Sequence, residues 1–166
     1  MVYKYLVLLL YLPYILYQYH QKLSPLEIYN TLQNKIYGKE TFTYIISIIA
    51  PYSGSINPSI DLFTKDTCHC SIIEKKSLQN PFNCIHAIAL ANLGELTSGL
   101  IMIQYLQNSK QKGIITKITT QYYQKARGKI YSVSNLNYLK NGTIKSQLFN
   151  ENGDLVCDVL CTWEIK

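Results

Sequence analysis

Long runs of basic residues are missing from this chain of 166 residues, although its formal net charge is +6. Its 16 Lys and Arg residues are scattered along the chain and mixed with 10 acidic residues. Proteins that bind nucleic acids usually gather their basic residues in one run or on one face. The composition therefore argues against a nucleic-acid partner. It leaves either a smaller anionic partner or simply a basic surface to explain the charge.

An even, regularly spaced set of cysteines is lacking as well. The chain has five cysteines, at positions 68, 70, 84, 157 and 161. Such an odd, scattered set does not make a disulfide framework, so we expect free thiols and an intracellular, reducing compartment. The segment Cys68-His69-Cys70 suggests a metal site, but on a strand His69 points to the opposite face from both cysteines. We therefore predict no metal site.

Asp, Glu, Lys and Arg are absent from the 17 positions between Lys4 and Lys22. This length is the lower limit for a membrane-spanning helix, but Pro13 interrupts the stretch and its tyrosines suit an interface. No small-residue cleavage site follows, which argues against a secretory signal. Three interpretations stay open: a membrane-surface contact through residues 3–19, a mitochondrial targeting segment, or an apolar helix packed on the domain.

Charge is also nearly absent between Ile85 and Leu106, where Glu95 is the only carboxylate and Lys, Arg and Asp do not occur. Two stripes recur there at helical steps of three and four. The first is Ala89, Leu93, Leu96, Leu100 and Ile103. The second, about 100° round the helix axis, is Ile88, Asn92, Glu95, Gly99 and Met102. We expect a helix buried on both faces, under a sheet on one side and something else, such as a second subunit, on the other.

The rest of the chain predicts shorter helices and antiparallel strands. Ser24-Pro25-Leu26-Glu27 is typical of a helix start with a capping box, and Gly38 suits the end of that helix. Residues 39–49 suit a short helix or, by their isoleucine pairs, a strand. Strands are predicted at residues 59–64, 67–75, 114–124, 128–139, 143–150 and 155–165. Asn141-Gly142 and Asn152-Gly153 indicate hairpins between the last three strands.

A meander of long antiparallel strands after one buried helix predicts an α+β fold in which the sheet wraps around the helix. A chain of 166 residues is long enough for one domain with a core of its own.

Three segments, in this order, resemble one protein family. Ala50-Pro51-Tyr52-Ser53-Gly54-Ser55-Ile56 is the first, and Tyr123-Gln124-Lys125-Ala126-Arg127-Gly128 is the last. Between them the pattern N-x5-HA-x-AL-x-NLGEL runs from Asn80 through His86 to Glu95. Together they are similar to PaaI-like hotdog-fold thioesterases, and closest to a poorly characterised branch defined as a domain of unknown function.

The resemblance covers the chain from Lys39 to the C-terminus and favours a helix over residues 39–49. It implies a hotdog fold, an antiparallel sheet wrapped around one long central helix. It divides the chain into an N-terminal apolar segment with a capped helix, residues 1–38, and a hotdog domain, residues 39–166.

The family's function implies roles for the residues of the motif. Glu95 occupies the position of the catalytic carboxylate, which acts as general base or nucleophile, and burial would raise its pKa toward the range of a base. The structural alternative is a Glu95 that hydrogen-bonds backbone or a partner helix. His86 lies at the predicted helix start, where free N–H groups can hold an oxyanion. In related enzymes the N–H just after this histidine makes that bond, and Ala87 matches the position, although many relatives carry glycine.

Two further sets of residues carry predictions. Asn80 matches the family's loop asparagine, which would orient water or the substrate carbonyl, and its alternative is a turn beside Pro81. Lys125, Arg127 and Lys129, if they share a strand face, could contact coenzyme A phosphates, and the alternative is a solvated edge. No cofactor is expected apart from coenzyme A as part of the substrate.

The spacing of His86 and Glu95 predicts a site built from two chains. Nine helical residues correspond to about 180° of rotation and about 13 Å of rise, so the two side chains cannot meet in one chain. We therefore expect a homodimer, or a dimer of dimers. The resemblance implies an acyl-CoA or another acyl thioester as the ligand. The alternative function is a non-catalytic hotdog module that binds an acyl group or a protein. A dehydratase of the same fold is discounted, because its His-Phe-Pro-Gly signature is not present.

Overall fold

The structure is a computed structural model that describes Pro13 and residues 23–166. The predicted membrane contact of residues 3–19 therefore lies outside the described residues, Pro13 excepted. The helices are α2 (Pro25–Leu32), α3 (Gly38–Ile49), α4 (Pro51–Gly54) and α5 (Ala87–Ser109), with 3-10 turns η1 (Lys76–Leu78) and η2 (Leu136–Tyr138). The strands are β1 (Ser59–Phe63), β2 (Thr67–Ile73), β3 (Gly113–Tyr122), β4 (Lys129–Asn135), β5 (Thr143–Phe149) and β6 (Leu155–Ile165).

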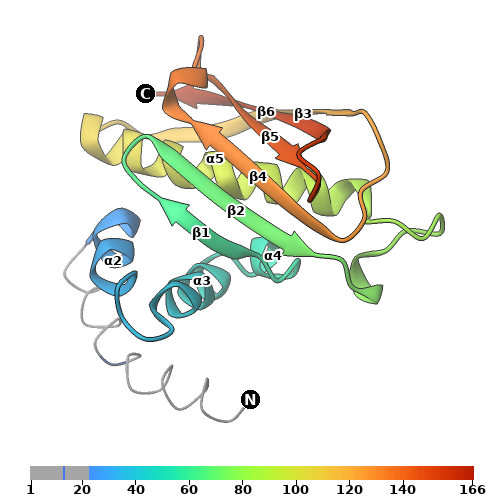
Figure 1. Ribbon diagram of the computed structural model, residues 1–166. Helices are drawn as coiled ribbons and strands as arrows, with labels where there is room; N and C mark the ends of the chain where they lie inside the picture. The colour runs from blue at the N-terminus through green and yellow to red at the C-terminus, as the bar shows by residue number, and fades with distance from the viewer. Residues whose placement is uncertain (1–12, 14–22) are drawn as a thin grey trace.

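The strands form one six-stranded antiparallel sheet in the order β1-β2-β4-β5-β6-β3, and α5 lies along one face of it (Figure 1). The predicted α+β class and the sheet wrapped on one long helix are confirmed. The predicted meander is wrong in one respect, because β3 pairs with β6 at the far edge and β2 pairs with β4. A helix of 23 residues is about 35 Å long, so α5 carries the chain across the sheet before β3 begins.

The helix α5 approaches the sheet most closely at Gly94. A Cβ atom placed there would lie 2.5 Å from Val159 Cγ2 on β6, so only glycine fits without a shift. Ser146 on β5 donates its hydroxyl to the Gly94 carbonyl at 2.7 Å. A small residue and a hydroxyl therefore fix the height of the helix above the strands.

The two predicted stripes of α5 are buried to different extents. The first stripe is buried except at Ile103, which is 40% exposed, so the prediction for Ile103 is wrong. In the second stripe Asn92, Gly99 and Met102 are buried, Glu95 is half-buried and Ile88 is 54% exposed. By length and composition α5 could cross a membrane, but core helices pass the same test and most of α5 is buried inside the protein.

The helix α2 begins as predicted and ends earlier than predicted. Glu27 N–H donates to Ser24 Oγ at 3.2 Å and Ser24 N–H donates to Glu27 Oε2 at 2.7 Å, which is a complete capping box. The helix ends at Leu32, and Gly38 begins α3 rather than ending α2. A Cβ on Gly38 would collide with the Leu32 carbonyl oxygen, so glycine is needed where the two helices meet.

The N-terminal helices share the core of the sheet. Tyr29 of α2 packs edge-on against Phe42 of α3 and Phe63 of β1, with ring centroids 5.1 and 5.9 Å apart. The Tyr29 hydroxyl also donates to the Asp61 carbonyl at 3.3 Å. The division of the chain at residue 38 stays a prediction.

The strand boundaries agree with the predicted ones to within two residues, except at the end of β4. This strand was predicted to reach Leu139 but ends at Asn135, whose side chain accepts a bond from Asn137 N–H at 2.9 Å and starts η2. On β2, Cys68 and Cys70 are fully buried with their sulfurs 3.7 Å apart, while His69 is half-buried, as strand alternation predicts.

Candidate active site

Glu95 lies in the middle of α5, half-buried, on the same stripe as the exposed Ile88. The exposed Ile103 lies two turns further along α5, about 80° round the helix axis from Glu95. Among the described residues no hydrogen bond or ion pair involves its carboxylate. Burial raises the pKa of Glu95 above its ordinary value of 4.5. An ionisable group held in this way, without a structural partner, is free to exchange a proton with a ligand.

The neighbours of Glu95 are small or neutral. The nearest atom to a Cβ built on Gly99 is Glu95 Oε1, at 3.3 Å, so the carboxylate lies against the glycine one turn further along the helix. Cys161 on β6 is close enough for the Glu95 charge to act on it. Burial, opposed by a Ser98 hydrogen bond, and the Glu95 charge together raise the pKa of Cys161 to about 11, so this thiol is neutral near pH 7.

The first turn of α5 has one free backbone donor. His86 is the N-cap, and its Nδ1 accepts a bond from Ile88 N–H at 3.1 Å. Ala89 and Leu90 both donate to the His86 carbonyl, at 2.9 and 3.3 Å. Of the four N–H groups that a helix start leaves unpaired, only that of Ala87 has no partner among the described residues. The Ala87 N–H, which is the predicted oxyanion donor, therefore has no hydrogen-bond partner among the described residues.

The role of His86 as a cap also determines its tautomer. Because Nδ1 accepts a hydrogen bond, a neutral imidazole carries its proton on Nε2. The residue is exposed, and no hydrogen bond of Nε2 is found among the described residues. The capping alternative is confirmed, and a donor remains available on the same side chain.

Two contacts hold the start of α5 in place. The Tyr122 hydroxyl at the end of β3 donates to the Ala87 carbonyl at 2.9 Å. Ile85 N–H donates to the Ala126 carbonyl, also at 2.9 Å, so the loop between β3 and β4 lies beside the helix start. Sequence reasoning missed Tyr122, because a bond from a strand end to a helix carbonyl leaves no local pattern.

Asn80 uses its side chain to shape its own loop. Its Oδ1 accepts from Phe82 N–H at 2.9 Å and from Cys84 N–H at 3.3 Å, and its Nδ2 lies 3.3 Å from Cys84 Sγ. This is the turn-making arrangement, and it sets the path of the chain into His86. A direct role of Asn80 in orienting water stays a prediction.

The three basic residues do not share a strand face, because β3 ends at Tyr122 and β4 begins at Lys129, so that premise is wrong. Their contact with coenzyme A phosphates stays a prediction. Lys125 and Arg127 are exposed on the loop that follows β3, beside the Ala126 contact to the helix start. Arg127 lies near Glu74, whose pKa is lowered by bonds from Gln79 and Gly128 and by the Arg127 charge. Lys129 begins β4, with its Nζ 4.8 Å from the centre of the Tyr131 ring. The glycine at 128 (φ 65°) turns the chain between them.

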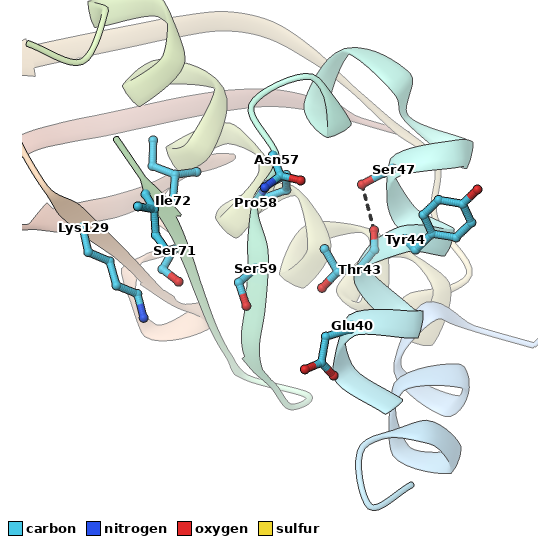
Figure 2. A pocket seen from close by; sticks show the side chains of 11 residues that line it. Glu40, Thr43, Tyr44, Ser47, Asn57, Pro58, Ser59, Ser71, Ile72 and Lys129 are labelled. Atoms are coloured by element: carbon cyan, nitrogen blue, oxygen red, sulfur yellow. Dashed lines mark hydrogen bonds between the residues drawn. The ribbon is translucent and has the colours of Figure 1, made fainter. Parts of the chain in front are cut away.

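The larger of two cavities on the described residues does not include Glu95 in its lining. It has a volume of about 470 Å³ between α3 and the β1, β2 and β4 strands. Figure 2 shows Lys129 on one side of it and Glu40 on the other, with Ser59 and Ser71 between them. None of the predicted catalytic residues lines this cavity, so its size alone does not make it the active site.

A smaller cavity of about 180 Å³ adjoins the start of α5. Its walls come from α4, η1 and the first two turns of α5, and they include His86, Ile88, Ala89 and Asn92. The cavity thus adjoins the residues on either side of Ala87, while Glu95 of the same chain lies further along the helix and does not line it. The pairing of His86 with a second chain's Glu95 stays a prediction.

Comparisons with known proteins give a family and a fold. The family model described as "Domain of unknown function (DUF4442)" matches residues 38–165. No curated protein is matched by the sequence.

Solved structures with the same fold include a variant of a thioesterase enzyme from Staphylococcus aureus. It has a TM-score of 0.61 and 18% identity, over 70% of this chain and 98% of the other. A Pseudomonas aeruginosa protein of unknown function, described as a probable thioesterase, has a TM-score of 0.65 and 13% identity, over 75% and 92% of the two chains. A variant of a hypothetical thioesterase from Streptococcus pneumoniae has a TM-score of 0.57 and 17% identity, over 66% and 90%. At these identities the likeness establishes the hotdog fold.

Proposed function

The chain belongs to the DUF4442 family of hotdog-fold proteins, and from this membership together with its free, half-buried carboxylate we propose that it hydrolyses acyl thioesters, with coenzyme A as the carrier. The observation that carries the proposal is Glu95, a carboxylate with a raised pKa and no hydrogen-bond partner among the described residues. A carboxylate kept only for structure would be tied to donors of its own fold. Thioesterase descriptions among the structural neighbours agree with the proposal.

In the proposed hydrolysis, the Glu95 carboxylate and the Ala87 N–H have one role each. The Glu95 carboxylate takes a proton from water, and the water oxygen attacks the thioester carbonyl carbon. The carbonyl oxygen gains negative charge and is stabilised by the Ala87 N–H and the positive end of α5. The carbon–sulfur bond then breaks, and Glu95 returns its proton to the leaving thiolate. In the alternative route the carboxylate itself attacks the carbon and water releases the acyl group.

The proposed site needs a second copy of the chain. His86 and Glu95 remain on one regular helix, so a partner's Glu95 has to approach the Ala87 N–H of this chain. Ile88 and Ile103 flank Glu95 on α5, about 22 Å apart, and are 54% and 40% exposed. Exposed apolar residues around a functional group are typical of a subunit interface.

The free edge of the sheet supports the same assembly. The outer strand β3 is ten residues long and exposes Ile114, Ile118 and Tyr122. A long, apolar edge strand is a template for pairing with another chain. Because Tyr122 also touches α5 at Ala87, the edge strand and the helix start can be covered by the same partner.

The carrier is proposed to meet the loop that follows β3. Lys125 and Arg127 flank Ala126, whose carbonyl accepts the bond from Ile85 just before the helix. Their charges are exposed and suit the phosphates of coenzyme A. Lys129 lines the larger cavity instead and is left out of this role.

A non-catalytic hotdog module remains the second candidate. The observation in its favour is that Asn80 and His86 are both engaged in local structure, as a turn and a helix cap. Such a module would bind the acyl thioester or another partner without turnover.

The test is thiol release from acyl-CoAs of graded chain length, measured on the purified full-length protein. The proposal predicts release above the uncatalysed rate for at least one length, with saturation at increasing concentration. Binding without release, across the whole range of lengths, would favour the module instead.

A further inference from the structure

Asn92 carries a buried polar atom that no other described residue satisfies. The residue is 8% exposed and lies on α5 one turn before Glu95. Its Nδ2 donates to the Tyr52 carbonyl on α4 at 3.0 Å. Its Oδ1 is buried without a partner among the described residues. A buried acceptor left unpaired costs about 1–3 kcal/mol, so a donor that reaches this atom would be stabilising, and the described residues supply none.

The orientation of the amide is determined by its one bond. A backbone carbonyl can only accept, so the atom facing Tyr52 has to be the NH₂ group of Asn92. Exchanging the two ends of the amide would place two oxygens against each other. Oδ1 is therefore the unpaired atom of the Asn92 amide among the described residues. Because it is an acceptor, its partner has to be an N–H or O–H donor.

Asn92 forms part of the wall of the 180 Å³ cavity at the helix start. The polar residues of that wall are Ser55, Ser77, Gln79, His86 and Asn92, and the apolar ones include Ile56, Leu78 and Ile88. One water takes a share of about 30 Å³ in the liquid, so the cavity is larger than a single bridging water requires. The side chains of Tyr52 and Ile88, which are 71% and 54% exposed, can move aside for an entering group.

We propose that this cavity binds the amide nearest the sulfur in a pantetheine-type carrier, and that Asn92 Oδ1 accepts the hydrogen bond from its N–H. The proposal rests on the thioesterase function argued above. Only two carbons separate that nitrogen from the thioester sulfur, so the amide lies close to the reacting carbonyl. The mixed wall suits a chain of alternating amides and methylenes.

The geometry of α5 agrees with this placement. From Ala87 to Asn92 the helix rises about 7.5 Å, and helical side chains lean toward the N-terminus. Asn92 therefore reaches back toward His86, which lines the same cavity. A thioester whose carbonyl meets the Ala87 N–H can thus extend its carrier past Asn92. Asn92 would act as a specificity-determining residue that selects amide-bearing thiols.

The experiment compares two ligands that cannot be hydrolysed. One is an S-(2-oxoalkyl)-pantetheine, a thioether ketone, and the other replaces the N–H of its sulfur-proximal amide by an ester oxygen. Calorimetric titration of the full-length protein should show about tenfold tighter binding of the amide, because one hydrogen bond to a buried acceptor is gained. The ratio of the two dissociation constants is an internal control for general effects on folding.

Three variants locate the source of that ratio. Asn92→Leu removes the acceptor and should bring the ratio close to one. Asn92→Asp keeps an acceptor but loses the bond to the Tyr52 carbonyl and sets an oxygen against it, so stability should fall while the preference for the amide survives. Ser77→Ala, in the same wall, is the matched control and should keep the wild-type ratio. Should Asn92→Leu fail to fold, the ratios of dissociation constants measured for the wild type and for Asn92→Asp still test whether an oxygen acceptor at position 92 selects the amide.

Equal affinities in the wild type, an unchanged ratio in Asn92→Leu, or no binding of either analogue would overturn the proposal. Thioester hydrolysis is assayed separately on the same preparations. A ratio that depends on Asn92 without hydrolysis would refute the thioesterase function and keep the amide site. Hydrolysis by a protein that binds both analogues equally would support the thioesterase function and refute the amide site.

Discussion

Glu95 is held where its ionised form is disfavoured. Its carboxylate is half-buried, and no donor among the described residues compensates for the lost water. Burial accordingly raises the pKa of Glu95 above 4.5. The folded protein therefore binds this proton more tightly than the unfolded chain does, and ionising Glu95 costs stability.

The first prediction is that Glu95→Gln raises the melting temperature more at about pH 7.5 than at about pH 4. A raised pKa in the folded state gives stability that is fully present below 4.5, the ordinary value, and is lost as the pH rises through the folded pKa. The substitution removes that loss. Thermal melting of both proteins across this pH range is the measurement. A larger gain at acid pH than at neutral pH would mean that the carboxylate has donors after all.

The helix α5 depends on glycine where it meets the sheet. At Gly94 a Cβ would meet Val159 on packed β6 at 2.5 Å, whereas at Gly99 it would meet only Glu95 Oε1 at 3.3 Å. The two glycines lie on the same helix but face different surroundings. They therefore make a matched pair for testing the close approach.

The second prediction is that Gly94→Ala lowers the free energy of unfolding by about 1–3 kcal/mol, because overpacking outweighs the gain in helix propensity. Gly99→Ala, the control, should change it by no more than about 1 kcal/mol and toward greater stability. Urea denaturation followed by circular dichroism measures both. Equal effects of the two substitutions would show that α5 does not sit as close to β6 as described.

Short signals made much of the element layout predictable from the sequence. The capping box at Ser24 and the hairpin at Asn141-Gly142 each depend on a few adjacent residues. In the hairpin, Asn141 and Gly142 both have a positive φ, 49° and 73°. The place of β3 depends on where a long helix delivers the chain, which no local pattern contains. Likewise, the bond from Asn92 to the Tyr52 carbonyl joins residues 40 positions apart, so the unpaired Oδ1 became visible only in the structure.

At the scale of the whole molecule, the single chain leaves two surfaces uncovered. One is the exposed side of α5, called the Glu95 face, which carries Glu95, Ile88 and, about 80° round the axis from Glu95, Ile103; the other is the edge of β3. An isolated chain also has its Ala87 N–H far along the helix from its only carboxylate on that face. Covering the surfaces and completing the site are both achieved by a second copy.

The third prediction is that the protein has twice the chain mass of 19.1 kDa by light scattering at micromolar concentration. Ile103→Glu should produce monomers and reduce thioester hydrolysis, because a charge is placed on the apolar Glu95 face. Ile36→Glu is the matched control, since Ile36 is 76% exposed between α2 and α3. It should leave both mass and activity unchanged. A monomeric wild-type protein that still hydrolyses thioesters would contradict the two-chain site.

The most direct test of the account is Glu95→Gln, assayed for acyl-CoA hydrolysis and thermal melting on one preparation. Glutamine keeps the shape of the side chain but cannot take a proton from water at neutral pH. Loss of a general base typically costs about a hundred- to ten-thousand-fold in rate, and we predict a loss of that size in a protein whose melting temperature is not lowered. An unchanged turnover number beside a lowered melting temperature would remove Glu95 from the chemistry and contradict the account.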